Sequence, residues 1–239
     1  GLNKFDKKQQ RFVRYFHQPN NKNSLPANNI KALTIDSKGI LWIGTNQGLS
    51  YYDKSKDHFI HIDLDNKQHA ITTIKEDSQG NLWLGTEQGI YQYSPIDQQT
   101  INIESLSALS NKFITALLII NQNDLWIGTK QGGATYSKTT NELITFSHQT
   151  DQPKSLSHDQ ITTLVNDTAG GIWVGTYANG LNRYDSSNAQ FHHTQRLANN
   201  TNSVSSNLII SFLELANKNI LIGTYDSGLN LFNQQTKKY

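Results

Sequence analysis

One pentapeptide recurs along this chain at nearly regular intervals and limits what the chain can fold into. Four copies contain an apolar residue, Trp, another apolar residue, Gly and Thr, and a fifth copy lacks only the Trp. The copies are Leu41-Trp42-Ile43-Gly44-Thr45, Leu82-Trp83-Leu84-Gly85-Thr86, Leu125-Trp126-Ile127-Gly128-Thr129, Ile172-Trp173-Val174-Gly175-Thr176 and Ile220-Leu221-Ile222-Gly223-Thr224. The interval between successive copies lengthens only slightly along the chain, which indicates an array of supersecondary repeats.

A second marker, which we call the marker isoleucine, lies at one fixed distance before the pentapeptide Gly in every repeat. The marker isoleucines are Ile30, Ile71, Ile114, Ile161 and Ile209. Because this distance is constant, the sequence predicts that the differences in repeat length lie in the loops that close each repeat. We expect these loops to span residues 17–29, 63–70, 104–112, 147–160 and 195–206.

Each repeat has the local pattern of short strands joined by tight turns. The β-branched segment that begins at the marker isoleucine predicts a first strand. A turn with Asp at its first position and Gly at its fourth follows in three repeats, at residues 36–39, 77–80 and 167–170. In the third repeat the segment Asn121-Gln122-Asn123 replaces this turn. One carboxylate per turn is too few ligands for Ca²⁺, so we interpret the Asp as a turn cap.

The pentapeptide predicts a second strand that is buried on both faces, because its apolar residues are consecutive rather than alternating. A third strand carries an aromatic residue four positions after its first Gly, and a fourth strand centres on an apolar residue. The fourth-strand residues are Phe12, Phe59, Ile101, Leu143 and Phe191. Four short antiparallel strands in each repeat predict an all-β fold, a β-propeller with one blade per repeat.

The first and last residues match the same part of a repeat. Gly1-Leu2-Asn3-Lys4-Phe5-Asp6 corresponds to Gly228-Leu229-Asn230-Leu231-Phe232-Asn233. We therefore expect residues 1–239 to form a propeller segment with a half-blade at 1–17 and five complete repeats, part of a larger and most simply seven-bladed ring. Closure as a five-bladed ring is the alternative. Without any Met, the chain is expected to begin inside a longer reading frame.

Composition excludes several classes of function. A net charge of +2 with 17 Lys and 4 Arg gives no footprint for nucleic acid, so none is expected as a partner. Without Cys, the chain has no disulfide, thiolate ligand or Cys nucleophile. The longest apolar run, residues 114–120, is far shorter than the ~20 residues of a membrane-spanning helix. Any contact with a membrane is expected only through segments outside this chain.

The repeat pattern resembles the two-component regulator propeller family. The residues that carry the likeness are the marker isoleucine, the Asp-turn, the pentapeptide and the preludes Asn23-Ser24-Leu25-Pro26, Lys154-Ser155-Leu156-Ser157 and Asn202-Ser203-Val204-Ser205. The resemblance implies a periplasmic sensor propeller of a bacterial inner-membrane receptor. It also implies a histidine kinase or diguanylate cyclase output domain outside this segment, a homodimer formed through the parent receptor, and glycan fragments as ligands.

The sequence offers no evident catalytic or metal site. The in-phase Trp residues predict packing between blades. The eight His do not recur at metal-ligand spacing, and we interpret them, His69 and His158 included, as surface or loop residues. Neither a Ser/His/Asp order nor a phosphate-binding Gly-rich loop is found. We therefore expect no catalytic residue, no metal and no cofactor.

Topology predicts where a ligand would bind. In a four-stranded meander, the turn from the second to the third strand lies on the same edge as the loops between blades, and we call this edge the rim. Function usually resides in loops held by a rigid scaffold. The candidate ligand-binding residues on these turns are Glu87, Lys130, Tyr177, Asn179, Tyr225 and Asp226. Their amides, charges and aromatic faces suit a glycan or another polar small ligand.

We therefore expect a non-enzymatic, extracytoplasmic propeller that recognises a ligand or a partner on its rim. One alternative is a propeller enzyme similar to a streptogramin lyase or a lactonase. Such an enzyme needs acids or His on the innermost strand, where this chain has mostly Thr, Ala, Leu and Ile. A second alternative is a scaffold that binds only other proteins.

Overall fold

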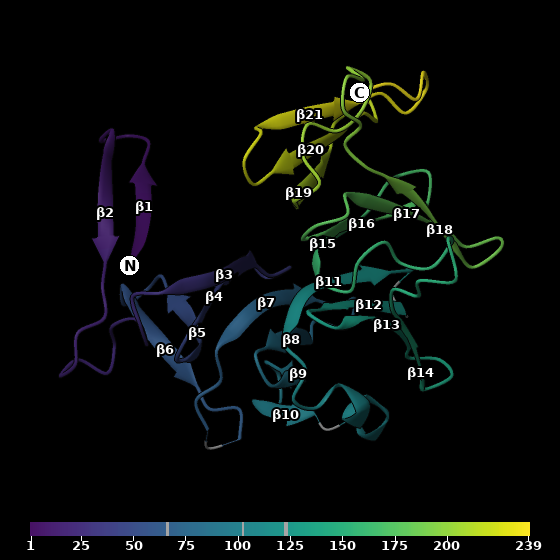
Figure 1. Ribbon diagram of the computed structural model, residues 1–239. Helices are drawn as coiled ribbons and strands as arrows, with labels where there is room; N and C mark the ends of the chain where they lie inside the picture. Colours follow the sequence, from purple (N-terminus) through teal and green to yellow (C-terminus); the bar gives the residue numbers. More distant parts are fainter. Residues whose placement is uncertain (66, 102, 122–123) are drawn as a thin grey trace. The chain divides into compact units, whose positions relative to one another are not determined.

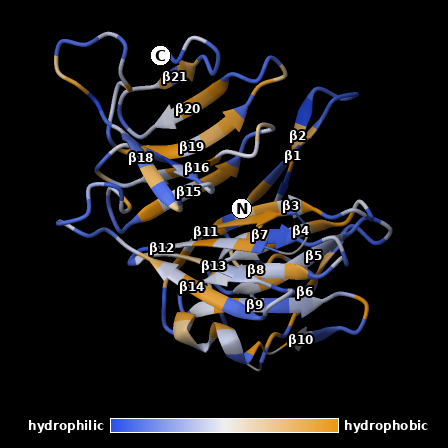
Figure 2. Ribbon diagram, turned by 90° about the vertical axis from the view of Figure 1, so that its right-hand side faces the viewer, coloured by the Kyte–Doolittle hydropathy of each residue, from blue (hydrophilic) through white to orange (hydrophobic). Residues whose placement is uncertain are grey.

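The computed structural model describes residues 1–65, 67–101, 103–121 and 124–239. It divides into two compact units, Gly1–Asn111 and Lys112–Tyr239, which we describe separately. Both units are built from antiparallel sheets in which consecutive strands are neighbours (Figure 1). Hydrophobic residues follow the strands and hydrophilic residues fill the turns (Figure 2).

The first unit contains a two-stranded hairpin, β1 (Leu2–Asp6) and β2 (Arg11–Tyr15), followed by two four-stranded sheets. The strands of these sheets are β3 (Ile30–Ile35), β4 (Leu41–Thr45), β5 (Gly48–Asp53), β6 (His58–Ile62), β7 (Ile71–Glu76), β8 (Leu82–Thr86), β9 (Gly89–Ser94) and β10 (Gln99–Ile101). A 3-10 helix, η1 (Glu104–Leu109), follows β10. The strand order within each sheet is the meander that the sequence predicts.

The second unit contains two four-stranded sheets and a final sheet of three strands. Its strands are β11 (Ile114–Ile120), β12 (Asp124–Thr129), β13 (Gly132–Ser137), β14 (Glu142–Phe146), β15 (Ile161–Asn166), β16 (Ile172–Thr176), β17 (Leu181–Asp185), β18 (Gln190–Thr194), β19 (Ile209–Glu214), β20 (Ile220–Thr224) and β21 (Leu229–Phe232). An isolated bridge between Asn233 and Lys238 continues the last sheet. The first strand of every complete repeat thus begins at its marker isoleucine.

The Asp of the predicted turns does more than cap the turn. The Asp77 carboxylate accepts hydrogen bonds from the backbone N–H of Gln79 and Asn81, both at 3.0 Å. It also accepts the indole N–H of Trp83 at 3.1 Å, and Asp36 and Asp167 hold Trp42 and Trp173 in the same way at 2.8 Å. A buried indole needs an acceptor, so this bond ties the turn to the second strand. The replacement turn at Asn121-Gln122-Asn123 lies partly outside the described residues.

The pentapeptide Gly is the contact point between neighbouring sheets. A Cβ built on Gly44 would lie 2.8 Å from the Ile71 side chain, and one on Gly128 would lie 2.6 Å from Ile161. Gly175 meets Ile209 similarly. The pentapeptide Gly of one repeat therefore packs against the marker isoleucine of the next. One such contact lies in the first unit and two lie in the second. Only Gly leaves room for this approach.

The Trp residues pack between sheets as predicted. The ring of Trp42 lies 6.1 Å from that of Tyr93, Trp126 lies 4.8 Å from Tyr184, and Trp173 lies 5.4 Å from Phe232. In each pair the partner is the third-strand aromatic of the next sheet. These pairs lie in the hydrophobic clusters that join the sheets of each unit.

In the part of the chain that the structure describes, no helix has both the length and the apolar character needed to cross a membrane.

Candidate functional site

A backbone hydrogen bond places the second-to-third turn beside the loop between blades in every complete repeat. The first N–H of each turn donates to the carbonyl just before the marker isoleucine. The bonds are Asn46 to Asn29 (3.2 Å), Glu87 to Ala70 (3.3 Å), Lys130 to Phe113 (3.2 Å), Tyr177 to Gln160 (3.0 Å) and Tyr225 to Leu208 (3.1 Å). Turns and loops therefore share one edge of each sheet, the rim.

The predicted ligand-binding residues lie on these turns, but not all are free. Glu87 is exposed in the first unit. In the second unit, the Lys130 ammonium lies over the Phe113 ring, 3.7 Å from its centroid. The Asn179 amide donates to the Ser157 carbonyl at 2.8 Å, so it holds a loop in place. Tyr177 and Tyr225 are 50% and 74% exposed.

Asp226 is also engaged locally. The hydroxyl of Ser227 donates to its carboxylate at 3.1 Å. Two hydrogen bonds lower the pKa of Asp226, the larger contribution coming from Ser206 and the smaller from Ser227. Of the six candidates, Glu87 and the two tyrosines present the most available side chains, and their role in binding stays a prediction.

Three of the five rim loops have one common structure, although we expected all five to vary. In each loop, a Ser hydroxyl accepts a hydrogen bond from the backbone N–H of the residue six positions earlier. An Asn or Asp side chain accepts a second hydrogen bond, from the backbone N–H of the residue eleven positions earlier. The Ser bonds are Gln18 to Ser24 (2.9 Å), Gln149 to Ser155 (2.9 Å) and Leu197 to Ser203 (3.1 Å). The Asn and Asp bonds are His17 to Asn28 (2.8 Å), His148 to Asp159 (2.6 Å) and Arg196 to Asn207 (2.6 Å).

A spacing in the sequence carries this information. The interval between the fourth-strand residue and the next marker isoleucine is the same in those three repeats, from Phe12 to Ile30, Leu143 to Ile161 and Phe191 to Ile209. The corresponding intervals from Phe59 to Ile71 and from Ile101 to Ile114 are clearly shorter. The two short loops, 63–70 and 104–112, are therefore the irregular part of the rim. Both lie in the first unit or at its end and flank the sheet β7–β10.

A pocket of about 470 Å³ lies between these two short loops, and we call it the η1 pocket. Its walls come from the loop after β6, the β8–β9 turn, β9, β10 and η1. The lining residues are Leu64, Asp65, Gln88, Gly89, Ile90, Tyr91, Gln92, Thr100, Ile101, Ile103, Glu104, Leu106, Ser107 and Ser110. The described pairs between β9 and β10 begin at Gln92, so the pocket lies over Ile90 and Tyr91.

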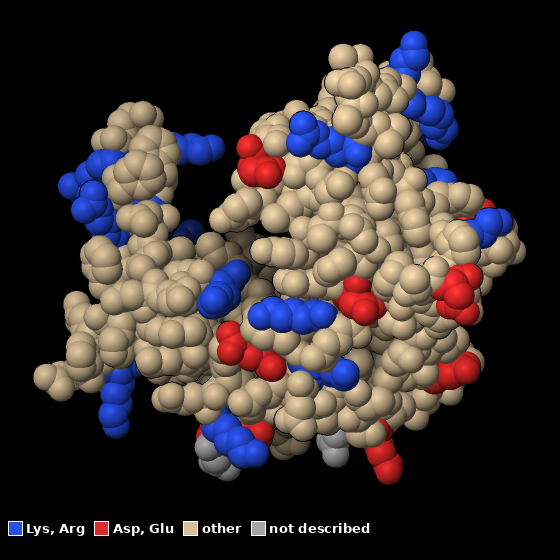
Figure 3. All heavy atoms as spheres, viewed as in Figure 1, with Lys and Arg blue, Asp and Glu red and all other residues tan. Residues whose placement is uncertain are grey.

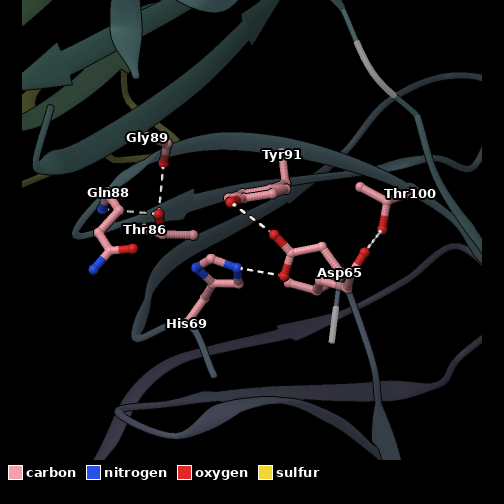
Figure 4. A network of polar contacts seen from close by, with 8 residues as sticks. Asp65, His69, Thr86, Gln88, Gly89, Tyr91 and Thr100 are labelled. Atoms are coloured by element: carbon pink, nitrogen blue, oxygen red, sulfur yellow. Dashed lines mark hydrogen bonds and ion pairs between the residues drawn. The ribbon is translucent and has the colours of Figure 1, made fainter. Parts of the chain in front are cut away.

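Asp65 and Tyr91, which line the η1 pocket, belong to a polar network with His69 (Figure 4). His69 Nε2 is 2.7 Å from the Asp65 carboxylate, and the Tyr91 hydroxyl donates to the other carboxylate oxygen at 3.5 Å. The rings of His69 and Tyr91 lie 4.7 Å apart. Burial raises the pKa of Tyr91, and the Asp65 charge raises it further, so the phenol stays protonated as a donor.

His69 lies in a loop, as the sequence predicts, but it is buried there and only 4% exposed. His69 lies two residues before its marker isoleucine, where three other repeats have Asn28, Asp159 and Asn207. Likewise, Tyr91 stands two residues after the first Gly of its third strand. The other repeats have Ser50, Ala134, Asn182 and Asn230 at this position. Comparison of repeat positions, rather than His spacing, would have identified both residues.

In the described residues, no group of three or more His, Asp or Glu side chains is arranged to hold a metal ion. Basic side chains gather on the β1–β2 hairpin, which carries Lys4, Lys7, Lys8, Arg11 and Arg14. On the face seen in Figure 3, both signs of charge are scattered over the rest of the surface. The η1 pocket is thus distinguished by its shape and its hydrogen-bonding groups rather than by a metal-binding cluster.

Comparison with solved structures shows that the fold is a β-propeller. The extracellular domain of the hybrid two component system BT3049 from B. thetaiotaomicron aligns with 97% of this chain and 30% of its own, at 23% identity and a TM-score of 0.77. That of the one component system BT4673 from the same organism aligns with 99% of this chain and 38% of its own, at 23% identity and a TM-score of 0.66. This chain therefore spans about a third of the length of either domain.

A more distant likeness concerns an enzyme. Virginiamycin B lyase from Staphylococcus aureus aligns with 86% of this chain and 70% of its own, at 10% identity and a TM-score of 0.60. At this identity the likeness is one of fold alone. Curated protein sequences gave no match to the chain.

The repeats themselves match a family model. Residues 24–47, 67–88 and 155–178 match the model described as two component regulator propeller. Each matched segment contains a marker isoleucine and a pentapeptide, the residues on which the resemblance was based. Three repeats of this β-propeller segment are therefore similar to the two-component regulator propeller repeat.

Proposed function

We propose that this chain is part of the extracytoplasmic sensing region of a bacterial signal-transduction receptor and binds a polar ligand, such as a glycan, on its rim. The observation that carries the proposal is the match of three repeats to the two-component regulator propeller model. The propeller is the non-catalytic input. In the proposed receptor, a membrane segment connects this periplasmic region to a kinase or cyclase output domain. The parent receptor forms a homodimer.

The architecture of the rim supports the ligand-binding part of the proposal. Three of its loops repeat one hydrogen-bonding pattern, whereas the two around the sheet β7–β10 depart from it and enclose a pocket. A regular scaffold with one local departure is what a binding site built on a repeat array requires. Polar groups of Asp65, Glu104 and Ser107, which line this pocket together with Tyr91, suit a small polar molecule.

A thermal-shift screen tests this proposal. The chain is heated with neutral, anionic and cationic oligosaccharides and with other polar metabolites, and a ligand should raise its unfolding temperature. Present at 100 times its Kd, a ligand adds about 2.7 kcal/mol to the free energy of unfolding. The variants Tyr177→Ala and Tyr225→Ala report whether the exposed turns take part. If no compound of the panel stabilises the chain, the alternative of a scaffold that binds only other proteins is favoured.

A further inference from the structure

The η1 pocket has an unbalanced distribution of charge. Two carboxylates line it, those of Asp65 and Glu104, and no Lys or Arg is among the described lining residues. The Glu104 side chain is exposed and makes no hydrogen bond or ion pair within the described part of the chain. An anionic ligand would therefore meet like charge, whereas a cation would meet two opposite charges.

His69 is not itself among the lining residues, but it contacts Asp65 and Tyr91, which are. The Asp65 carboxylate can only accept, so the neutral ring carries its proton on Nε2 and leaves a lone pair on Nδ1. Nδ1 is buried and has no hydrogen-bond partner in the described structure. In Figure 4 it points toward the turn of Thr86 and Gln88, and Gln88 lines the pocket. A buried acceptor without a partner is costly unless a ligand or a water donates to it.

The pocket also has apolar lining, in addition to its carboxylates. Tyr91 is half-buried and lines the pocket together with Ile90 and Ile103. The face of a tyrosine ring attracts both a cation and the apolar face of a ring-shaped ligand. At about 470 Å³ the pocket is within the range of small-molecule sites.

We infer that the η1 pocket binds a compact ligand that carries a protonated amine beside an apolar face, with the amine between Asp65 and Glu104 and the apolar face toward Tyr91. This inference rests on the proposed function, since it names the ligand class and the site of the proposed sensor. It assigns binding to the sheet β7–β10 rather than to the exposed tyrosines of the second unit.

Isothermal titration calorimetry with three probes tests the inference. Glucosamine carries a free amine, N-acetylglucosamine has the same ring without the charge, and glucuronic acid reverses the charge. Near neutral pH, glucosamine should bind at least about tenfold more tightly than N-acetylglucosamine, because an ammonium–carboxylate hydrogen bond contributes more than a neutral one. Glucuronic acid should bind most weakly. Added salt should weaken glucosamine binding selectively.

Matched carboxylate variants identify the site. Glu104→Gln should lower the affinity for glucosamine about tenfold while leaving thermal unfolding unchanged, since Glu104 is exposed. Glu142→Gln is the control, because Glu142 is an exposed carboxylate on β14 that does not line the pocket. Its affinity should equal that of the wild type. Asp65→Asn should also weaken binding.

The outcomes separate this inference from the proposed function. Equal affinity for the two amino-sugar probes, or wild-type affinity in Glu104→Gln, would overturn the assignment of an amine to this pocket. Binding of another polar compound that is lost in Tyr225→Ala would overturn the pocket and keep the sensor. Failure of every compound in the thermal-shift panel would remove the ligand-sensing function itself.

Discussion

The indole N–H of Trp42 donates to the Asp36 carboxylate at 2.8 Å, and both side chains are buried. The same carboxylate accepts the backbone N–H of Lys38 at 3.0 Å and of Ile40 at 2.8 Å. In the fifth repeat both members of the pair are replaced, by Leu215 and Leu221. Asp and Trp thus act as a unit: loss of one leaves the other with a buried polar group that lacks its partner.

A double-mutant cycle tests this unit. Asp36→Leu should destabilise the chain by about 3 kcal/mol, because three donors lose their acceptor. Trp42→Leu should cost about 3 kcal/mol through lost packing. The double variant, which copies the fifth repeat, should cost about 1–2 kcal/mol less than the sum. Urea unfolding monitored by circular dichroism measures all four proteins, and strict additivity would contradict the unit.

The contact between Gly44 and Ile71 leads to a second prediction. Gly44→Ala places a methyl group 2.8 Å from the Ile71 side chain, which forces the two sheets apart. We expect a loss of about 2 kcal/mol, as for overpacking in a tight core. The penalty of Gly44→Ala should be smaller in an Ile71→Ala background, where space has been made. An equal penalty in both backgrounds, measured by thermal unfolding, would show that the clash lies elsewhere.

The sequence predicted the strands and the meander because both depend on patterns among residues that are close in the chain. The contact of Gly44 with Ile71 joins two different repeats. The constant interval between the marker isoleucine and the pentapeptide Gly of one repeat does not reveal such a contact. The placement of the Asp-turns also followed from local pattern, but the bond from Asp77 to Trp83 depends on a side-chain direction. Local pattern does not determine that direction.

The candidate site was harder to predict than the fold. Asn179 was chosen as a ligand-binding residue, but its amide is already bonded to the Ser157 carbonyl. His69 lies in a loop, as expected, but comparing the His residues with each other does not reveal that it is buried. Burial of His69 depends on Tyr91, which lies on the third strand of the sheet that follows it. Such a pairing is a property of the folded chain.

The burial of His69 leads to a third prediction. His69→Ala should cost about 2 kcal/mol, because it removes a buried ring from Tyr91 and the shorter of the hydrogen bonds to Asp65. His192 is the matched control: it also lies near a carboxylate, 3.8 Å from Asp185, but its side chain is 58% exposed. His192→Ala should change stability by less than about 0.5 kcal/mol. Similar losses in both variants, measured by urea unfolding, would contradict the difference in environment.

A fourth prediction concerns pH. Asp57 accepts the hydroxyls of Tyr52 at 2.6 Å and Tyr15 at 2.8 Å, and these hydrogen bonds lower the pKa of Asp57. Because the folded pKa is below the unfolded one, the stabilisation is complete above about pH 4 and is lost as the pH falls through the folded pKa. Asp57 is exposed, so screening limits the effect to about 0.5–1 kcal/mol.

Asp57→Asn isolates this effect, because Asn keeps the acceptor and the left-handed backbone at this position. Asn141 shows the same arrangement, with φ of 56° and the Tyr136 hydroxyl at 2.8 Å. Between neutral pH and about pH 3, the variant should lose about 0.5–1 kcal/mol less stability than the wild type. Asp151→Asn, at an exposed carboxylate, should keep the wild-type dependence. Urea unfolding at both pH values decides the question: if Asp57→Asn follows the wild type, the two tyrosine hydrogen bonds do not stabilise the charged carboxylate.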